Sequence, residues 1–492
     1  MNYTYLVFHA EERPQGLAFT DGTRAVSYAE QLCHVNKFIR TAAALGLAPG
    51  NSVAIGCDDF YTHWLLIQAF EYLGIASASF HAQEGGSARA LLGTVDLVLA
   101  EPHYPPGGWK TRAITPQWLQ AIHDLPDGVL PPPAQWQPDQ PVRIVRTSGT
   151  TGEAKRFHLG YAGNEARLQQ LSWLYREHPT GRGSLSTLSF AIGATYHFAS
   201  LALRGGRVVV TASRVAIHEL PDRIRQDRLC SVTLLPVQIK ELLDHLPPDW
   251  VKPERLEITA FGAPVPDELR HAALERLADR IVEIYGSNEI GTVAVTLRPG
   301  TNGFGTLMPN VTVEIVGEAG EKLPDGEAGE IRIRGAGRFA GYVDDPTLTR
   351  RMLRDGWFYP GDLGIMQGRT LQITGRTGDQ VNLGGVKYGL AKIEGAAQRV
   401  GGAGLKDVGA VPIPNAAGLD AIHIALVTDG SDDRGVLERI GGALRPMLAG
   451  DINFIRLPAI PRNDAGKIDR AKLKAAILAI HAEQSARGRR EP

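Results

Sequence analysis

The chain is poor in cysteine: Cys33, Cys57 and Cys230 are its only three among 492 residues, and they lie far apart. This spacing excludes a disulfide framework and shows no zinc-binding pattern. Each cysteine has apolar neighbours, so we expect buried structural thiols. So few cysteines in a chain of this size favour a reducing compartment, and we expect a cytoplasmic protein.

Net charge and long hydrophobic runs are also missing. The formal net charge is -1, so no global field points to nucleic acid or to an anionic membrane as a partner. No window approaches about 18 consecutive apolar residues, and we expect no transmembrane helix. The N-terminus lacks a basic segment, and Glu11 and Glu12 follow early, which argues against a signal peptide. The remaining composition, 43% apolar and 21% charged, is ordinary for a soluble globular protein of more than one domain.

Residues 28–46, 62–73 and 163–176 carry apolar side chains at helical spacing and predict helices. The second of these, which Gly74 ends, is predicted to be amphipathic. Short apolar runs alternate with such helices of about 10–15 residues, which predicts a parallel sheet with helices on its faces. The runs with strand character are residues 52–55, 75–80, 96–99, 142–145, 185–190, 207–210, 231–235, 256–261 and 281–284.

The pattern changes in the second half of the chain. Residues 303–374 form short β-rich runs separated by Gly and Asp turns, typical of a small β-barrel or a curled sheet. A compact segment of mixed helical and strand character follows Gly375-Arg376. We therefore predict an α/β fold in two domains. Residues 1–375 form a large N-terminal domain of packed α/β sheets with a β-barrel-like subdomain, and residues 376–492 form a small α+β C-terminal domain.

A polar loop, Thr147–Lys155, follows a proline-rich passage (residues 126–141, predicted as an extended surface connection) and the apolar run 142–145. Four hydroxyls and two glycines fill its first six positions, and a lysine ends it. Glycines let backbone N–H groups approach a phosphate, while hydroxyls and the lysine bind phosphate oxygens. The loop therefore predicts a polyphosphate site, with an ordinary polar hairpin loop as the alternative. A Walker P-loop is excluded because its spacing of glycine, lysine and hydroxyl is absent.

Five further polar clusters lie where no core requires them, although each alone could be a turn, a linker or a solvated surface group. A carboxylate at the carboxyl end of a strand, such as Glu289, lies where α/β sheets bind ligands and could hold Mg²⁺. Asp362, in a Pro-Gly turn, could accept the hydroxyls of a ribose. The five clusters are Tyr285–Glu289, Tyr359–Gly364, Gly375–Asp379, Leu383–Gly385 and Pro461–Arg470, the last of which presents Lys467.

In this order and spacing, the loop and the five clusters resemble those of the adenylate-forming superfamily of acyl- and aryl-CoA synthetases, peptide-synthetase adenylation domains and luciferases. The resemblance covers almost the whole chain. It implies that the protein binds ATP and Mg²⁺, the latter through Glu289. It also implies a mobile C-terminal domain that rotates between two reaction steps. The nucleotide and phosphate contacts that it implies are Thr147, Ser148, Gly149, Thr150, Thr151, Gly152, Lys155, Gly262, Ala263, Pro264, Tyr285, Gly286, Asn288, Asp362 and Arg376.

The resemblance also implies two half-reactions. A carboxylate attacks the α-phosphate of ATP to give acyl-AMP and pyrophosphate, and a thiol then displaces AMP. Lys467 would neutralise the charge that develops in the first step. Glu289, through Mg²⁺, and Thr151, through the phosphates, would complete the catalytic set. The hinge and thiol tunnel would be formed by Gly378, Asp379, Gly384 and Gly385.

The acceptor expected from this resemblance is CoA, supplied from outside, because no carrier domain follows Lys467. One alternative is a ligase that loads the phosphopantetheine of a separate carrier protein or forms an amide. A second alternative is a non-catalytic, nucleotide-binding relative.

The position of the acid pocket follows from Phe190, which aligns with a Phe of the family. Adenylation domains for α-amino acids have an Asp after this Phe, whereas this chain has Ala191, so a plain α-amino acid is disfavoured. A histidine common near this place in aryl-CoA ligases is also missing. The expected pocket walls are apolar and suggest an acyl or aryl acid with little charge. They are Phe190, Ala191, Tyr196, Leu235 and Phe261, while His197 is expected to be a core histidine.

Overall fold

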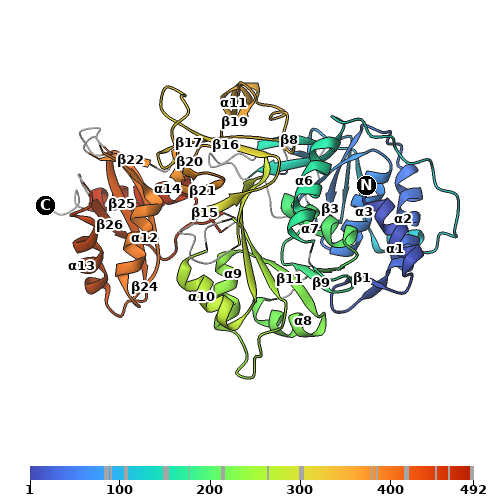
Figure 1. The fold of residues 1–492 in the computed structure, drawn as a ribbon, viewed down its shortest axis with the longest axis horizontal. Coiled ribbons are helices and arrows are strands. Elements are labelled where there is room, and N and C mark those ends of the chain that lie inside the picture. Colours follow the sequence, from blue (N-terminus) through green and yellow to red (C-terminus); the bar gives the residue numbers. More distant parts are fainter. Residues whose placement is uncertain are drawn as a thin grey trace.

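A computed structural model describes residues 1–81, 88, 91–104, 109–147, 155–176, 178–211, 216–262, 265–297, 304–377, 380–383, 386–414, 420–448, 452–463 and 466–487. Its architecture is α/β, as the sequence predicts. In Figure 1 the blue N-terminal sheet and the red C-terminal region lie at opposite ends of the molecule, with a larger sheet between them. None of the described helices is long and apolar enough to cross a membrane.

The N-terminal sheet contains β3 (Ser52–Gly56), β4 (Ala76–Ser79), β5 (Leu97–Ala100), β6 (Thr111–Ala113), β7 (Pro141–Thr147) and β8 (Lys155–Gly160). The strand order is β6-β5-β3-β4-β7-β8. All neighbouring pairs are parallel except β7 and β8, which are antiparallel. The carboxyl ends of β3, β4, β5 and β7 therefore meet at one edge, and the predicted phosphate loop is the connection between β7 and β8.

Helices α1 (Asn2–Glu12), α2 (Tyr28–Ala43), α3 (Phe60–Tyr72) and α5 (Pro116–His123) belong to this region. The prediction of an amphipathic helix over 62–73 is wrong in one respect, because every residue of α3 is buried. The helix contacts α1, α2 and the sheet at once, and the ring of Trp64 stacks on Phe190 at 5.6 Å between centroids. A helix enclosed on all sides has no solvent-facing stripe, so its sequence shows no clean polar face.

The central sheet begins with a parallel part. Its strands are β1 (Leu17–Thr20), β9 (Gly183–Ser186), β10 (Val208–Thr211), β11 (Leu229–Leu234), β12 (Glu257–Ala260) and β13 (Arg280–Ser287), with β2 (Ala25–Ser27) antiparallel to β1. Helix α6 (Tyr161–Leu174) leads from β8 into this part. Helices α7 (Gly193–Arg204), α8 (Leu220–Gln226), α9 (Pro236–Asp244) and α10 (Asp267–Arg276) connect its strands, with the 3₁₀ turn η2 (Ile217–Glu219) before α8. The predicted strand 185–190 extends too far toward the C-terminus, because β9 ends at Ser186 and a turn follows.

The second part of the central sheet is the predicted β-rich region. It contains β14 (Gly291–Thr296), β15 (Phe304–Leu307), β16 (Val311–Val316), β17 (Ala328–Gly335), β18 (Leu353–Arg354), β19 (Trp357–Phe358), β20 (Asp362–Gln367) and β21 (Thr370–Arg376), with α11 (Pro346–Met352). Its neighbouring strands are antiparallel, and β14 joins it directly to β13. The sequence predicts that the cluster Tyr285–Glu289 follows a strand, but β13 continues through Ser287 and turns into β14.

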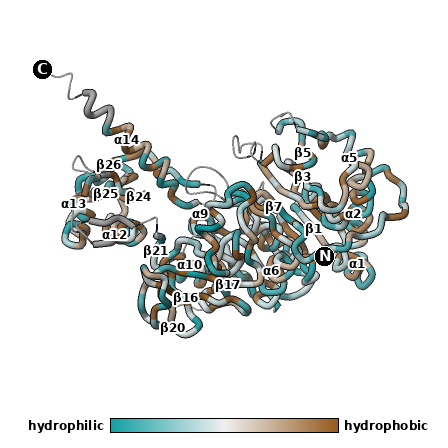
Figure 2. Tube along the Cα trace, turned by 90° about the horizontal axis from the view of Figure 1, so that it is seen from above, coloured by the Kyte–Doolittle hydropathy of each residue, from teal (hydrophilic) through white to brown (hydrophobic). Residues whose placement is uncertain are grey.

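The C-terminal region has its own sheet and core. It contains β22 (Gln380–Leu383), β23 (Val386–Gly389), β24 (Leu405–Pro414), β25 (Asp420–Thr428) and β26 (Ile452–Arg456), and helices α12 (Leu390–Gly401), α13 (Asp433–Leu444) and α14 (Arg470–Arg487). Strands β24, β25 and β26 pair in that order, and α12 and α13 cover an apolar cluster on them. Figure 2 shows α14 running outward from this region toward the C-terminus. The domain boundary at residue 375 remains a prediction; β21 crosses it and ends at Arg376.

The burial of α3 leads to a stability prediction. Trp64→Ala removes a side chain with 0% exposure, so we expect the free energy of unfolding to fall by about 3–5 kcal/mol. Trp173→Ala is the matched control, because Trp173 is 46% exposed on α6. The control should stay within about 0.5 kcal/mol of the unsubstituted protein. Thermal unfolding followed by circular dichroism measures both, and equal shifts for the two variants would contradict the buried position of α3.

Candidate functional site

The predicted site residues gather where the carboxyl ends of parallel strands meet. Thr147 ends β7, while Phe261 and Gly262 follow β12, and Tyr285 and Gly286 lie near the end of β13. Such edges are where open α/β sheets bind ligands. The antiparallel strands β20 and β21 add two more predicted residues to the same part of the molecule, Asp362 and Arg376, as an opposed pair.

Asp362 is a buried carboxylate held by two donors. The Tyr285 hydroxyl donates to Oδ2 at 2.7 Å, and Arg376 Nε donates to Oδ1 at 2.7 Å. Asp362 is only 5% exposed, and burial together with this carboxylate raises the pKa of Tyr285 well above its usual value. Gly361, just before it, has a φ of +75°, which a glycine adopts without strain. The structure thus joins three of the predicted nucleotide contacts into one hydrogen-bonded group with a fixed orientation.

Glu289, the predicted magnesium ligand, is also buried and held. The hydroxyl of Tyr342 donates to its Oε1 at 2.8 Å, and the Phe339 amide donates to its backbone oxygen at 2.7 Å. Burial, with the nearby Glu289 carboxylate, raises the pKa of Tyr342 far above its usual value, so the hydroxyl stays a donor. Sequence reasoning missed Tyr342, because it lies in the β-rich region 53 residues beyond Glu289 and no motif spacing links the two.

The same tyrosine reaches the predicted phosphate loop. Lys155 Nζ lies 5.7 Å from the centroid of the Tyr342 ring, within the range of a cation–π contact. Val343 N donates to Arg156 O at 2.9 Å, and Phe157 forms a β-bridge with Tyr342. The chain around Tyr342 is therefore fixed along β8, and both Lys155 and Glu289 contact this one aromatic side chain.

Asn288 ties the two sheets together. Its Nδ2 donates to the backbone oxygen of Arg146 at 3.1 Å, one residue before the end of β7. The Arg146 guanidinium in turn donates to the backbone oxygen of Ser79, at the end of β4. The end of β13 and the start of the phosphate loop are therefore held by a direct hydrogen bond.

The expected acid pocket is only partly assembled. Phe190, Ala191 and Tyr196 line a small cavity between β7 and α7, together with Arg143 and His197. Phe190 and Tyr196 are 2% and 1% exposed, so most of their surface is core rather than pocket wall.

The other two expected wall residues lie elsewhere. Leu235 and Phe261 are at the ends of β11 and β12 and do not line that cavity. The ring of Phe261 faces Phe198 on α7, at 6.4 Å between centroids. His197 is buried as expected, and burial lowers its pKa to about 3.

Lys467 is exposed, on a turn between β26 and α14. Its N–H donates to Asn463 Oδ1 at 3.1 Å, and its carbonyl accepts from Asn463 N at 2.8 Å. Gly466 has a φ of +72°, and a Cβ built there would lie 4.0 Å from Leu235 and 3.9 Å from Val237. The turn of the C-terminal region therefore rests against the start of α9, next to the carboxyl end of β11.

Several predicted residues lie outside the described part of the chain, so their placement is not discussed. They are Ser148, Gly149, Thr150, Thr151, Gly152, Ala263, Pro264, Gly378, Asp379, Gly384 and Gly385.

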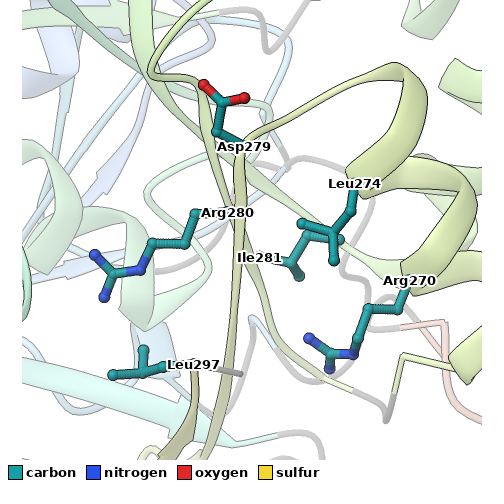
Figure 3. Close-up of a pocket in the computed structure, with 6 residues that line it drawn as sticks. All are labelled: Arg270, Leu274, Asp279, Arg280, Ile281 and Leu297. Carbon is teal, nitrogen blue, oxygen red and sulfur yellow. The ribbon is translucent and has the colours of Figure 1, made fainter. Parts of the chain in front are cut away.

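A cavity of about 260 Å³ lies away from all of these residues. Figure 3 shows it around the start of β13, with Arg270 and Leu274 coming from α10. Its two arginines already have carboxylate partners, Arg270 with Glu283 and Arg280 with Glu257. It lies at the amino end of β13, whereas the predicted ligand-binding residues lie at the carboxyl end, so we do not assign it to the site.

Comparisons with known proteins fit this geometry. A sequence model of the family described as AMP-binding enzyme matches residues 7–343. The chain is 28% identical to an indoleacetate–CoA ligase of Aromatoleum aromaticum over 61% of this chain and 58% of that ligase. It is 26% identical to the fatty acid–[acyl-carrier-protein] ligase ScoC of Streptomyces coeruleorubidus over 95% of this chain and 94% of that protein.

A solved structure has a similar fold. The o-succinylbenzoate coenzyme A synthetase of Bacillus subtilis, in complex with ATP and magnesium ion, superposes with a TM-score of 0.83 at 18% identity. The superposition covers 96% of this chain and 99% of that one. At this identity the likeness concerns the arrangement of the chain rather than its chemistry.

Gly286 gives a testable constraint on the site. A Cβ at this position would lie 2.2 Å from the backbone oxygen of Gly291, so Gly286→Ala must push β14 away from β13. We expect a loss of about 1–3 kcal/mol in the free energy of unfolding. Gly375→Ala is the control, since a Cβ there meets nothing within 4 Å. Denaturant unfolding measures both variants, and a Gly286→Ala protein as stable as the control would show that the hairpin tolerates a side chain.

Proposed function

Because the chain belongs to the family of AMP-binding enzymes, we propose that it is an ATP-dependent ligase. It activates a carboxylic acid as acyl-AMP with release of pyrophosphate, then transfers the acyl group to the thiol of CoA. The observation that carries the proposal is the convergence of Asp362, Glu289 and the Lys467 turn at one edge of the sheets. The names of the two curated relatives, both acid–thiol ligases, support the same reaction class.

Asp362 would bind the ribose of ATP. A carboxylate with one donor on each oxygen keeps further lone pairs for the two ribose hydroxyls. Arg376 forms an ion pair with the buried Asp362 carboxylate. The carboxylate therefore stays paired while it accepts hydrogen bonds from the neutral ribose. Tyr285 fixes the plane of the carboxylate and closes one side of the nucleotide site. Gly262, Ala263, Pro264, Gly286 and Asn288 would complete the nucleotide contacts.

Glu289 and Lys155 would act on the phosphates. Carboxylate oxygen is the ligand type that Mg²⁺ prefers, and Tyr342 is the only described residue that hydrogen-bonds to the Glu289 carboxylate, through one oxygen. The residues present therefore fit a magnesium ion, which would neutralise phosphate charge when bound. Lys155 and the loop residues Thr147, Ser148, Gly149, Thr150, Thr151 and Gly152 would hold the pyrophosphate that leaves.

Lys467 would act on the reacting atoms. In the first step a carboxylate oxygen bonds to the α-phosphorus, and the bond to the bridging oxygen of pyrophosphate breaks. An ammonium between the acid and the α-phosphate stabilises the charge that gathers there. In the second step the thiol sulfur bonds to the acyl carbon, AMP leaves, and the thiol proton passes to solvent. Gly378, Asp379, Gly384 and Gly385 would serve the domain rotation and the thiol passage between the steps.

The acceptor has one specific rival. The relative ScoC is named as a ligase of a fatty acid with an acyl carrier protein, and it matches 95% of this chain. Loading of a carrier-bound phosphopantetheine is therefore the second candidate function. Amide formation, or nucleotide binding without catalysis, would appear as outcomes of the tests below.

The acid substrate is best identified with a panel of carboxylic acids that includes acids with a second charged group. The expected acid has little charge, because the expected pocket walls are apolar. Arg143, however, lines the same cavity and is only 4% exposed. Its guanidinium donates to the Ser77 and Ser79 hydroxyls rather than to a carboxylate. The panel should therefore pair acyl and aryl monocarboxylic acids with dicarboxylic acids of the same length.

Lys467→Ala should lower the rate of acid-dependent ATP–pyrophosphate exchange by about 10² or more, since one charge-stabilising donor is lost. Lys472→Ala is the matched control, because Lys472 is an exposed lysine five residues away, paired with Asp469. The control should keep the full exchange rate. Equal exchange by the two variants would remove Lys467 from the reaction, and an unsubstituted protein without exchange on any acid would favour a non-catalytic relative.

The acceptor test uses an acid that supports exchange. We expect AMP release to accelerate on addition of CoA alone, with a new acyl thioester visible by mass spectrometry. Release that requires a phosphopantetheinylated carrier protein would assign the ScoC type of reaction instead. Release with simple amines but not with thiols would assign amide formation.

A further inference from the structure

Two arginines flank the turn that carries Lys467, and one of them fastens the turn to β24. On the near side, Arg462 Nη1 donates to the backbone oxygen of Gly466 at 2.8 Å. The same guanidinium makes two contacts with Asp407, Nη2 to Oδ1 at 2.7 Å and Nε to Oδ2 at 3.2 Å. Asp407 belongs to β24, so one planar group joins the sheet of the C-terminal region to the peptide directly before Lys467.

On the far side, Arg470 starts α14 and makes a similar contact. Its Nη1 and Nη2 bind the two oxygens of Glu394 at 2.6 and 3.2 Å. Nη1 also donates to the backbone oxygen of Ala410, whose N–H donates back to Glu394 at 2.8 Å. This pair is largely buried, with side-chain exposures of 20% and 13%, and it anchors the helix rather than the turn.

The turn itself presents an exposed lysine. Gly466, just before Lys467, has the left-handed φ of +72°. Asn463 exchanges hydrogen bonds with Lys467 within the turn. The side chain of Arg462 connects the Gly466–Lys467 peptide to a neighbouring element, β24.

A turn of this kind needs an external brace if its lysine is to meet a developing charge. Displacement of a charge-stabilising group by about 1 Å can cost about 10²-fold in rate. Arginine suits this role, because its planar fork holds a carboxylate with two bonds and still has N–H groups for a carbonyl. Lysine in its place would keep the charge but would not hold both partners.

We propose that Arg462 is a positioning residue for adenylation: braced by Asp407, it holds the peptide of Lys467 in place for the acid-activating step. The proposal rests on the proposed function. Arg462 acts through Lys467 and touches neither substrate nor the reacting atoms. Transfer from acyl-AMP to the thiol does not use the lysine, so the brace matters for one half-reaction only.

The protein contains a close match for a control. Arg439 binds Asp432 at 2.9 Å through Nη1 and the backbone oxygen of Gly401 at 2.7 Å through Nη2. Its side chain is 44% exposed, against 40% for Arg462. The two arginines thus make the same kind of bridge, in the same region, at similar exposure, and only one of them reaches the lysine turn.

The test compares Arg462→Gln with Arg439→Gln in the full-length protein. Arg462→Gln should lower ATP–pyrophosphate exchange by about 10- to 100-fold, while thioester formation from supplied acyl-AMP stays within about twofold. Arg439→Gln should leave both rates unchanged. Arg462→Lys should remain impaired in exchange, which separates bracing from a simple effect of charge.

A double-mutant cycle tests the role of Asp407. Asp407→Asn should reproduce the loss caused by Arg462→Gln, and the double variant should be no worse than either single one, because both remove one brace. Losses that simply multiply would show that the two residues act independently, which would overturn the pairing. Equal loss in both half-reactions, or in the Arg439→Gln control, would overturn the positioning role.

A measurement without turnover keeps the brace distinct from the proposed function. Hydrogen exchange of the segment 461–469 should be faster in Arg462→Gln than in the unsubstituted protein, and unchanged in Arg439→Gln. Unchanged exchange in Arg462→Gln would refute the brace whatever the activity. A protein with the expected hydrogen exchange that activates no acid would instead refute the proposed function.

Discussion

A carboxylate taken out of water must be held by donors, and for Glu289 the donor is the hydroxyl of Tyr342. Much of the site depends on this hydrogen bond. It fixes the chain around Tyr342 against β13, while Val343 fixes the same chain against β8. Lys155, at the start of β8, then rests on the ring of Tyr342. A negative and a positive side chain from two different sheets are thereby held in register by one aromatic residue.

The remaining parts of the site follow from where strands end. The carboxyl edges of the two sheets are joined by Asn288, and β20 and β21 bring Asp362 and Arg376 to the same place as an opposed pair. Lys467 reaches this edge from a separate core, through the contact of its turn with the start of α9. The predicted site residues thus come from two regions that each have their own apolar core.

The sequence predicted the α/β class and most strands of the two sheets, because short apolar runs between helical segments have few other solutions. It failed where tertiary contacts override the local pattern. Helix α3 has no polar face because it is enclosed on all sides, and β13 runs past Ile284 because its partner β14 follows after a short turn. The predicted nucleotide residues Tyr285, Asp362 and Arg376 do lie in contact.

Residues that act through other residues escaped prediction for a different reason. Tyr342 belongs to no motif, and Arg462 lies in the cluster Pro461–Arg470 but its role does not follow from its spacing to Lys467. Their partners, Glu289 and Asp407, lie 53 and 55 residues away. Only the folded chain shows that one hydroxyl holds a carboxylate, or that one guanidinium holds a turn. For the expected acid pocket, the sequence predicted wall residues that the fold uses differently. Phe190 and Tyr196 are apolar and near strand ends, as a pocket wall would be, but they are mostly used by the core.

Burial distinguishes Asp362 and Glu289 from Lys467. Asp362 and Glu289 are 5% and 9% exposed, and their hydrogen-bond partners compensate for their removal from water. Lys467 is exposed, and under the proposed function an exposed ammonium would keep its hydration if its turn left the sheet edge. A buried lysine would have to be desolvated again at each cycle of the expected domain rotation. The fixed part of the lysine's position must therefore come from its backbone, and a brace on the Gly466 carbonyl supplies it without burying the charge.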